Sequence, residues 1–182
     1  MRHPDNHIIY TIGHSTHSFA AFLEMLQSFD IRVLADIRRF PGSHKYPQFN
    51  KDVLGPALEK NGIYYTHLEA LGGRRKVRAD SPNNRWKNAS FRGYADYMET
   101  KEFVTAVAKL EAIALQQTTA YMCSEAVWWR CHRSMVSDYL KAKGWTVLHI
   151  MGVGKATEHT FTAPARVEGD CVFYSDSGLF DQ

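Results

Sequence analysis

The sequence has only three cysteines among its 182 residues and no apolar run long enough to cross a membrane. An odd number this small excludes a disulfide framework, so the cysteines are expected as thiols that serve either packing or chemistry. A membrane-spanning helix needs about 20 apolar residues, and residues 1–7 lead into no apolar core of a signal peptide. We therefore expect a cytoplasmic protein without a membrane partner.

The composition is that of an ordinary globular protein, with 45% hydrophobic and 23% charged residues. This balance excludes intrinsic disorder and a collagen-like chain. The length fits one domain, and we find no internal repeat, low-complexity tract or linker. We predict a single domain over residues 1–182, with a core over residues 8–150 and a tail over residues 151–182 that packs on it.

Positive charge is concentrated in one stretch of the chain. The net charge is only +3, but seven Lys or Arg residues lie between Arg74 and Arg92 against one acid, Asp80. This stretch belongs to a polar segment, residues 69–90, which is longer than most structureless loops in compact domains. It is interpreted either as an arm that binds phosphates or as a solvated loop.

Buried strands alternate with amphipathic helices along the sequence. Ser18 and Thr100 are predicted helix caps, and a hairpin is expected near residues 172–174. The pattern predicts the α/β class: a single three-layer domain with a mostly parallel five-stranded sheet and helices on both faces. A truncated barrel-like sheet is the alternative, and the strand order stays open. The strands are expected over residues 8–12, 32–37, 63–68, 118–123 and 145–150, and the helices over residues 19–29, 51–60, 91–98, 101–114 and 131–143.

Polar and reactive residues follow the strands at one edge of the predicted sheet. Ligands of parallel sheets bind outside the carboxyl ends of the strands, whereas the connections at the other edge hold only turn-forming residues. The candidate site residues at this edge are Gly13, His14, Ser15, Asp36, Arg38, Gly72, Gly73, Cys123, Glu125, Cys131, His132 and Arg133.

The segment from Cys123 to Arg133 holds the most concentrated chemistry. Cys131 lies at the predicted amino end of a helix, where unpaired N–H groups and nearby positive charge favour a thiolate. Cys131 is therefore the expected nucleophile, and Glu125 is expected to orient His132 or to act as acid and base. Cys123 is either an ordinary buried strand residue or a further member of the site.

Two other roles for the cysteines stay open. Cys123, Cys131 and His132, together with His14 or His67, could bind zinc, but the sequence has no Cys-x-x-Cys or His-Glu-x-x-His motif. We therefore predict neither a metal nor a cofactor. A disulfide between Cys123 and Cys131 is possible on geometric grounds.

Anion binding is expected from the first two strand ends. Residues 13–15 either hold a phosphate on helix N–H groups or form an ordinary turn. Arg38 and Arg39 either bind phosphate or carboxylate oxygens or pair with Asp36. The loop pair Trp128 and Trp129 either stacks on a ring of the ligand or closes over the core.

Several ordered motifs together resemble the bacterial proteins grouped as domain of unknown function 488. The resemblance covers residues 8–150 and implies a single α/β domain whose motifs gather at one site, which adds Tyr94 to the candidate residues. The sequence departs from the family pattern at Ala126, where a basic residue is common. The motifs are Tyr10–Ser15, Asp36–Arg38, Pro41–Ser43, Leu71–Gly73, Phe91–Ala95, Cys123–Glu125 and Cys131–Arg133.

We expect an enzyme, or a degenerate enzyme, that acts on an anionic, phosphate-bearing ligand such as a nucleotide or a nucleic acid. Arg38, Arg133 and His14 would bind the anion, Cys131 would be the reactive thiolate, and Glu125 its acid/base partner. One alternative is a non-catalytic nucleic-acid-binding module that uses residues 74–92. Another is a metal-binding regulator.

Overall fold

A computed structural model describes residues 7–177 of the chain. The strands are β1 Ile8–Gly13, β2 Val33–Asp36, β3 Tyr64–His67, β4 Thr119–Cys123, β5 Thr146–Gly152, β6 Lys155–Glu158, β7 Arg166–Glu168 and β8 Cys171–Phe173. The α-helices are α1 Phe19–Gln27, α2 Lys51–Glu59, α3 Ala89–Met98, α4 Lys101–Ala114 and α5 Arg133–Ala142. Three short 3₁₀ turns are η1 Pro47–Phe49, η2 Glu69–Leu71 and η3 Trp128–Arg130.

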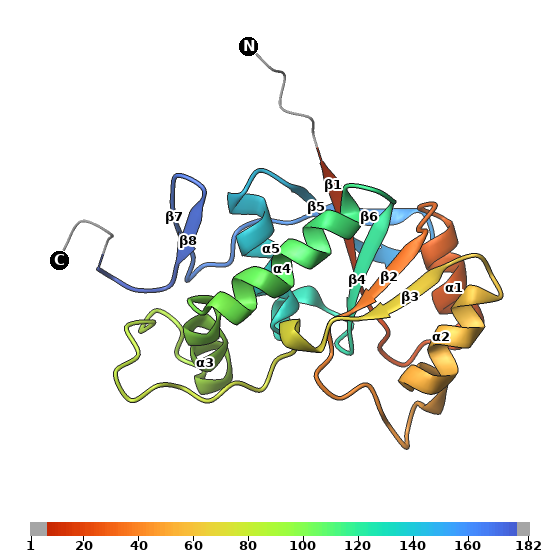
Figure 1. The fold of residues 1–182 in the computed structure, drawn as a ribbon, viewed down its shortest axis with the longest axis horizontal. Coiled ribbons are helices and arrows are strands. Elements are labelled where there is room, and N and C mark those ends of the chain that lie inside the picture. The colour runs from red at the N-terminus through yellow and green to blue at the C-terminus, as the bar shows by residue number, and fades with distance from the viewer. Residues whose placement is uncertain (1–6, 178–182) are drawn as a thin grey trace, which may run out of the picture.

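One sheet of six strands organises the molecule, in the order β3-β2-β4-β1-β5-β6 (Figure 1). The first five strands run parallel, which confirms the predicted mostly parallel α/β sheet. The sixth strand, β6, comes from the tail and pairs antiparallel with β5. Sequence analysis missed it because Lys-Ala-Thr-Glu has no apolar pattern, as suits a solvated edge strand. The expected hairpin near residues 172–174 is formed by β7 and β8.

Helices cover both faces of the sheet, so the domain has three layers, and α4 lies across one face (Figure 1). Alternate residues of β4 divide between the layers: Tyr121 belongs to the core beneath α3, α4 and α5, and Ala120 and Met122 to the core beneath α1 and α2. By the same alternation Cys123, the last residue of β4, continues on the side of Tyr121. The end of this strand therefore directs a thiol toward the start of α5.

The predicted caps of two helices are present. The Ser18 hydroxyl accepts a hydrogen bond from the Ala21 N–H at 3.2 Å, and the Thr100 hydroxyl accepts one from the Phe103 N–H at 3.3 Å. The helix expected from residue 131 begins later, at Arg133. Cys131 has extended backbone (φ −140°) because it joins η3 to the helix cap at His132.

The long polar segment between η2 and α3 is fixed against α3 by one buried carboxylate. Asp96 accepts hydrogen bonds from the Arg78 N–H at 2.8 Å, the Ser81 hydroxyl at 2.5 Å and the Asn83 amide at 2.8 Å.

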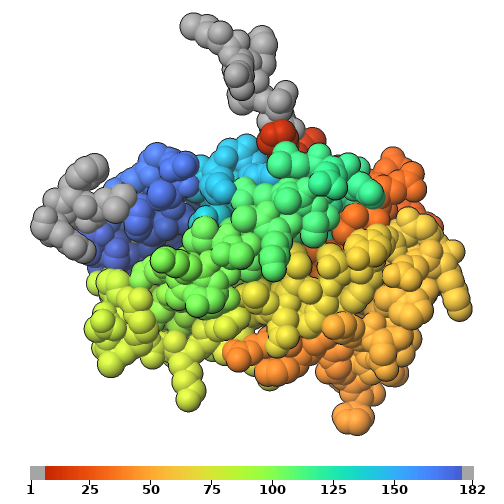
Figure 2. Space-filling view, viewed as in Figure 1, coloured from red at the N-terminus to blue at the C-terminus, as the bar shows by residue number. Residues whose placement is uncertain are grey.

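In Figure 2 the chain near residue 70, in yellow, lies directly beside the orange loop that follows β2. Across residues 7–177, no helix combines the length and the apolarity that a membrane span requires.

Candidate functional site

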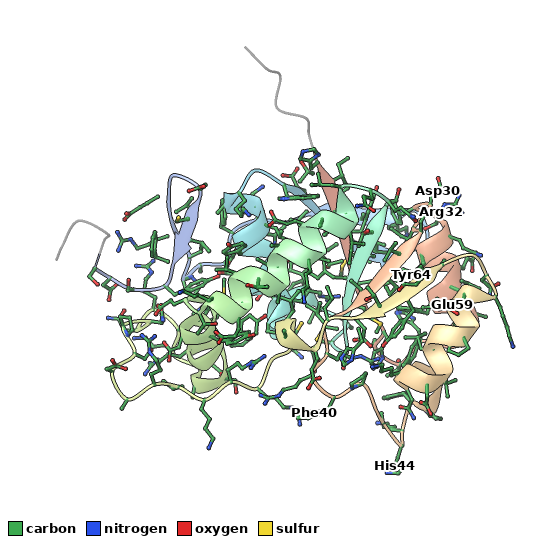
Figure 3. The ribbon with its side chains drawn as sticks, viewed as in Figure 1. Asp30, Arg32, Phe40, His44, Glu59 and Tyr64 are labelled. Atoms are coloured by element: carbon green, nitrogen blue, oxygen red, sulfur yellow. The ribbon has the colours of Figure 1, made fainter. Side chains whose placement is uncertain are left out.

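The carboxyl ends of the central strands open into two adjoining hollows. In Figure 3, Phe40 lies at the lower edge of the molecule, past the carboxyl end of β2, and Arg32 lies at the opposite end of that strand. The larger hollow has a volume of about 430 Å³ and the smaller about 320 Å³, and Arg38, Phe40, Ser124 and Glu125 line both. Of the predicted site residues, those that line the larger hollow are Arg38, Gly73, Tyr94, Cys123, Glu125, Cys131 and His132, and those that line the smaller are His14, Ser15, Arg38 and Glu125.

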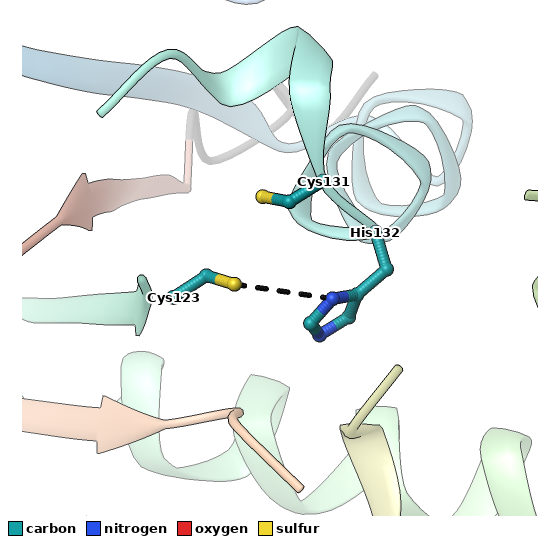
Figure 4. Close-up of side chains that lie close together, drawn as sticks. All are labelled: Cys123, Cys131 and His132. Carbon is teal, nitrogen blue, oxygen red and sulfur yellow. Dashed lines mark hydrogen bonds between the residues drawn. The ribbon is translucent and has the colours of Figure 1, made fainter. Parts of the chain in front are cut away.

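Two thiols and one imidazole meet in the larger hollow (Figure 4). The Sγ atoms of Cys123 and Cys131 and a ring nitrogen of His132 all lie within 4.8 Å of one another. Both cysteines are nearly buried, with 6% and 8% of their surface exposed. Three soft donor atoms this close could hold a metal ion such as zinc.

The orientation of the His132 ring is fixed from its far side. Its Nε2 lies 3.1 Å from the carbonyl oxygen of Ile37, and a carbonyl can only accept a hydrogen bond, so Nε2 carries a proton. The other nitrogen, Nδ1, lies 3.9 Å from the Cys123 Sγ. In the neutral ring, Nδ1 therefore presents a lone pair to this thiol. The carbonyl of Ile37, rather than the predicted Glu125, orients the imidazole.

The surroundings of the two thiols favour a thiolate at Cys123 over one at Cys131. The hydrogen bond from the Cys131 thiol, together with the nearby His132 and Arg133, holds the pKa of Cys123 well below that of a free thiol and outweighs the effect of burial. The neighbouring Cys123 and burial raise the pKa of Cys131 well above its ordinary value. The sequence-based choice depended on a helix that starts at Cys131, and the observed helix starts two residues later.

Arg38 is held by the protein on three sides and has one N–H group left for a ligand. Its Nε and Nη2 donate to the Asp36 carboxylate at 2.9 and 2.6 Å, and Nη2 also donates to the Phe49 carbonyl at 2.7 Å. Its Nη1 donates to His14 Nε2 at 3.3 Å. These four bonds use four of the five guanidinium N–H groups. Asp36 thus positions Arg38, and its carboxylate contributes no surface to either hollow.

His14 is a neutral partner of Arg38. The ring is 4% exposed, and burial is the main cause that lowers its pKa. Its Nδ1–H donates to the Ser15 carbonyl at 3.0 Å, which leaves Nε2 to accept from Arg38. Of the two interpretations of residues 13–15, the turn fits the structure: α1 begins only at Phe19, and the N–H groups of His14 and Ser15 donate to the carbonyls of Cys123 and Ser124 at 3.1 and 2.9 Å.

At Gly13 and Gly72 the backbone lies in close contact with another segment of the chain, at Glu125 and at Arg39, and neither glycine contacts a hollow. A Cβ on Gly13 would lie 1.7 Å from the carbonyl oxygen of Glu125, and one on Gly72 would lie 2.6 Å from the Cβ of Arg39. Only glycine fits where these segments touch. Both residues therefore shape the hollows without lining them.

Arg133 was expected to bind an anion, but the structure buries it. Its side chain is 1% exposed, lines neither hollow, and donates to the carbonyls of Glu125 at 3.1 Å and Ala126 at 3.5 Å. These bonds tie the loop after β4 to the start of α5. Arg133 is thus a positioning residue, and its charge lies near the two thiols.

Other arginines supply the positive charge of the larger hollow. Arg39, Arg74 and Arg130 line it, and the Arg39 and Arg74 guanidinium groups lie 5.5 and 5.7 Å from the ring centre of Phe40. Phe40 is 62% exposed, and no sequence signal indicated a role for it. Arg74 belongs to the basic stretch, which was a usable signal.

Most of the basic stretch is bound to the protein itself. Four of its seven cations contact a ring, a carboxylate or backbone carbonyls of the same chain, so the stretch offers fewer free charges for a nucleic acid than its composition suggests. These contacts are Arg75 on Tyr97, Arg78 on Glu99, Arg85 on Asp176 and Arg92 on the Trp86 carbonyl.

The two tryptophans before Cys131 have different surroundings. The Trp128 ring stacks on His149 with centroids 4.5 Å apart, while Trp129 is 53% exposed. His149 in turn bonds to Thr11 at 2.7 Å and to His159 at 2.9 Å. Trp128 thus packs against the protein and supports the loop that carries the site, and Trp129 stays available to a ligand.

A family model described as "Domain of unknown function DUF488" matches residues 18–140, which is more than half of the chain. No curated protein and no solved structure matches the chain.

Proposed function

We propose that this chain, which belongs to the DUF488 family, is an enzyme whose Cys123 thiolate attacks a small anionic ligand. The observation that carries the proposal is the placement of Cys123 between His132 Nδ1 and the Cys131 thiol, in a hollow lined by four arginines. A thiolate is the nucleophilic form of cysteine, and a neighbouring histidine activates it. Guanidinium groups bind carboxylates and phosphates in a forked geometry.

The residues of the hollow have different roles in the proposed reaction. Arg39, Arg74 and Arg130 bind the anionic groups of the ligand. His132 Nδ1 takes the proton of the Cys123 thiol, the sulfur forms a bond to the electrophilic atom, and the leaving group departs with the electrons of the broken bond. The protonated His132 then gives its proton to the leaving group. Glu125 is exposed at the rim shared by both hollows, where its carboxylate can accept a hydrogen bond from the ligand.

The experiment is alkylation of the chain with iodoacetamide at a series of pH values, with the modified cysteine identified by mass spectrometry. Cys171 is exposed in β8 and serves as a reference thiol in the same molecule. The midpoint of the pH profile is the readout, because burial slows the absolute rate at Cys123. We expect the midpoint of Cys123 to lie well below the pH of about 8.5 at which a free thiol titrates, and below that of Cys171, whose pKa is raised by burial and by Asp170. If the midpoint of Cys123 lies near pH 8.5 or higher, Cys123 is not a thiolate and the proposal fails.

A competition with anions tests the binding part. Inorganic phosphate and citrate are expected to slow the alkylation of Cys123 and to leave that of Cys171 unchanged, and the protection should weaken as chloride is added. If phosphate and citrate slow the alkylation of Cys123 and Cys171 equally, the hollow does not bind anions and this part of the proposal is wrong.

A further inference from the structure

Apart from its hydrogen bond to Cys123, the second thiol of the site forms and breaks no bond in the reaction described above. Cys131 lies with its Sγ within 4.8 Å of the Cys123 Sγ and of the His132 ring nitrogen, and all three groups line the same hollow. A thiolate that attacks carbon or phosphorus needs no second thiol. A thiolate that attacks sulfur forms a mixed disulfide, which a neighbouring thiol can resolve.

We propose that the ligand is a small disulfide that carries carboxylate or phosphate groups, and that its reduction leaves a disulfide between Cys123 and Cys131. This inference rests on the proposed thiolate role of Cys123 and names the substrate class of the same site. The two sulfurs must approach from at most 4.8 Å to about 2.05 Å. Rotation of Cys131, which stands on extended backbone between η3 and α5, can supply much of this movement.

The shape and charge of the site fit a ligand of two anionic halves. The hollows of about 430 and 320 Å³ adjoin each other and share the rim residues Ser124 and Glu125, directly after Cys123. One half of a disulfide can therefore occupy each hollow, with the S–S bond at the rim beside the thiolate. Arg39, Arg74 and Arg130 line the larger hollow, and Arg38, which is paired with Asp36 and keeps one N–H group for a ligand, lines both.

The reaction has two exchange steps. The Cys123 thiolate attacks one sulfur of the ligand R–S–S–R, a mixed disulfide Cys123–S–S–R forms, and R–S⁻ leaves and takes a proton from the protonated His132. Cys131 then gives its proton to His132 Nδ1, and its sulfur attacks the Cys123 sulfur. The second R–S⁻ leaves with the proton of His132. Two electrons pass from the protein to the ligand, two R–SH are released, and an external dithiol must reduce the protein disulfide for another cycle.

The test uses oxidised glutathione, whose halves carry carboxylates, and cystamine, which has the same S–S bond between cationic halves. The whole chain, fully reduced, is mixed with each probe, released thiol is counted, and the protein product is identified by intact mass and peptide mapping. With oxidised glutathione we expect two thiols per chain and a Cys123–Cys131 disulfide. The reaction should be faster than with cystamine by an order of magnitude or more at low salt, and this preference should shrink as salt is added.

Two cysteine variants separate the steps. Cys131→Ser should stop at the mixed disulfide, with one thiol released and one glutathionyl group on Cys123. Cys171→Ser, a change at an exposed thiol outside the site, should behave as the unaltered chain.

Three results would overturn the inference. They are an equal rate with cystamine, release of two thiols by Cys131→Ser, and formation of the protein disulfide by hydrogen peroxide but not by oxidised glutathione. If any of them is found while Cys123 keeps its low alkylation midpoint, only the substrate class is wrong. If the midpoint is that of an ordinary thiol, the proposed function fails as well.

Discussion

Replacing Gly73 by alanine should disturb the pairing of His132 with Cys123 without touching either residue. A Cβ on Gly73 would lie 2.9 Å from His132 Nδ1, whereas ordinary contacts begin at 3.4–4 Å. The ring, held at Nε2 by Ile37, must therefore move its Nδ1 by about 0.5 to 1 Å. If the ring moves directly away from Cys123, the distance from Nδ1 to the Cys123 Sγ grows from 3.9 Å to at most about 5 Å.

The size of the effect follows from the charges of the imidazolium–thiolate pair. At an effective dielectric constant of about 20, lengthening the pair by roughly 1 Å costs about 1 kcal/mol of Coulomb energy. Loss of the charge-assisted hydrogen bond costs about 1.5 kcal/mol more. The sum of about 2.5 kcal/mol corresponds to a ~60-fold fall in the alkylation rate of Cys123 at pH values below its original midpoint, since 1.4 kcal/mol is about tenfold.

The assay is the alkylation profile of Gly73→Ala compared with Gly42→Ala, because a Cβ on Gly42 would meet nothing within 4 Å. Thermal unfolding of both variants checks that the fold is retained. The midpoint of Cys123 should move to higher pH in Gly73→Ala and stay in place in Gly42→Ala. A folded Gly73→Ala chain with an unchanged midpoint would refute the role of His132 in setting the charge of Cys123.

Three further predictions address the surroundings of the site. Burial lowers the pKa of His149 from 6.5 to about 2. As the pH falls below 6.5, the imidazole is therefore protonated in the unfolded chain but not in the folded one. The stabilisation that is present above pH 6.5 is lost progressively as the pH falls toward 2. The free energy of unfolding should then fall by up to about 1.4 kcal/mol per pH unit more than in His149→Gln, as measured by urea unfolding at pH 6 and 4; equal slopes would contradict it. Arg133→Met leaves two carbonyls without their donor and should cost about 1–3 kcal/mol in the same assay, with faster proteolysis after β4; unchanged stability would contradict it. Asp96→Ala removes three hydrogen bonds to residues 78–83 and should make that segment the first site of limited trypsin cleavage. Asp80→Ala is the control and should leave the cleavage pattern unchanged, because Asp80 makes only an exposed ion pair with Arg78.

The fold could be predicted because its signals are local. Apolar runs and helical spacing predict the first five strands and the five α-helices found within residues 7–177, and residue type alone predicts the caps Ser18 and Thr100. β6 was missed because an edge strand that faces solvent needs no apolar residues. Its pairing depends on a turn that brings the chain back onto β5, and periodicity cannot report this.

The gathering of the site was predictable, but the roles of its residues were not. The carboxyl ends of parallel strands lie at one edge of the sheet, and this rule predicts that Cys123, Cys131, His132 and Arg38 lie close together. All four line the larger hollow. The role of a side chain at that place depends on which way it points, and this changed with a two-residue shift in the start of α5. With this shift Cys131 lies before the helix cap at His132 rather than in the first turn of the helix, and Arg133 is buried.

The partners of the arginines are likewise set by tertiary contacts. Arg38 and Arg133 were the arginines expected to bind the anion, yet both are buried and bonded to the protein. Arg39 and Arg130, which are more exposed, line the hollow beside Arg74. An arginine bound to its own protein cannot be distinguished by residue type from one that is free for a ligand.

The ultraviolet absorbance of the thiolate, followed during a pH titration of the reduced chain, tests the central claim most directly. A free thiol titrates near pH 8.5. We expect one thiolate that persists far below this pH in the unaltered chain and in Cys171→Ser, and that is lost in Cys123→Ser. A chain whose thiols all titrate near or above pH 8.5, or a low-pH thiolate that survives in Cys123→Ser, would contradict it.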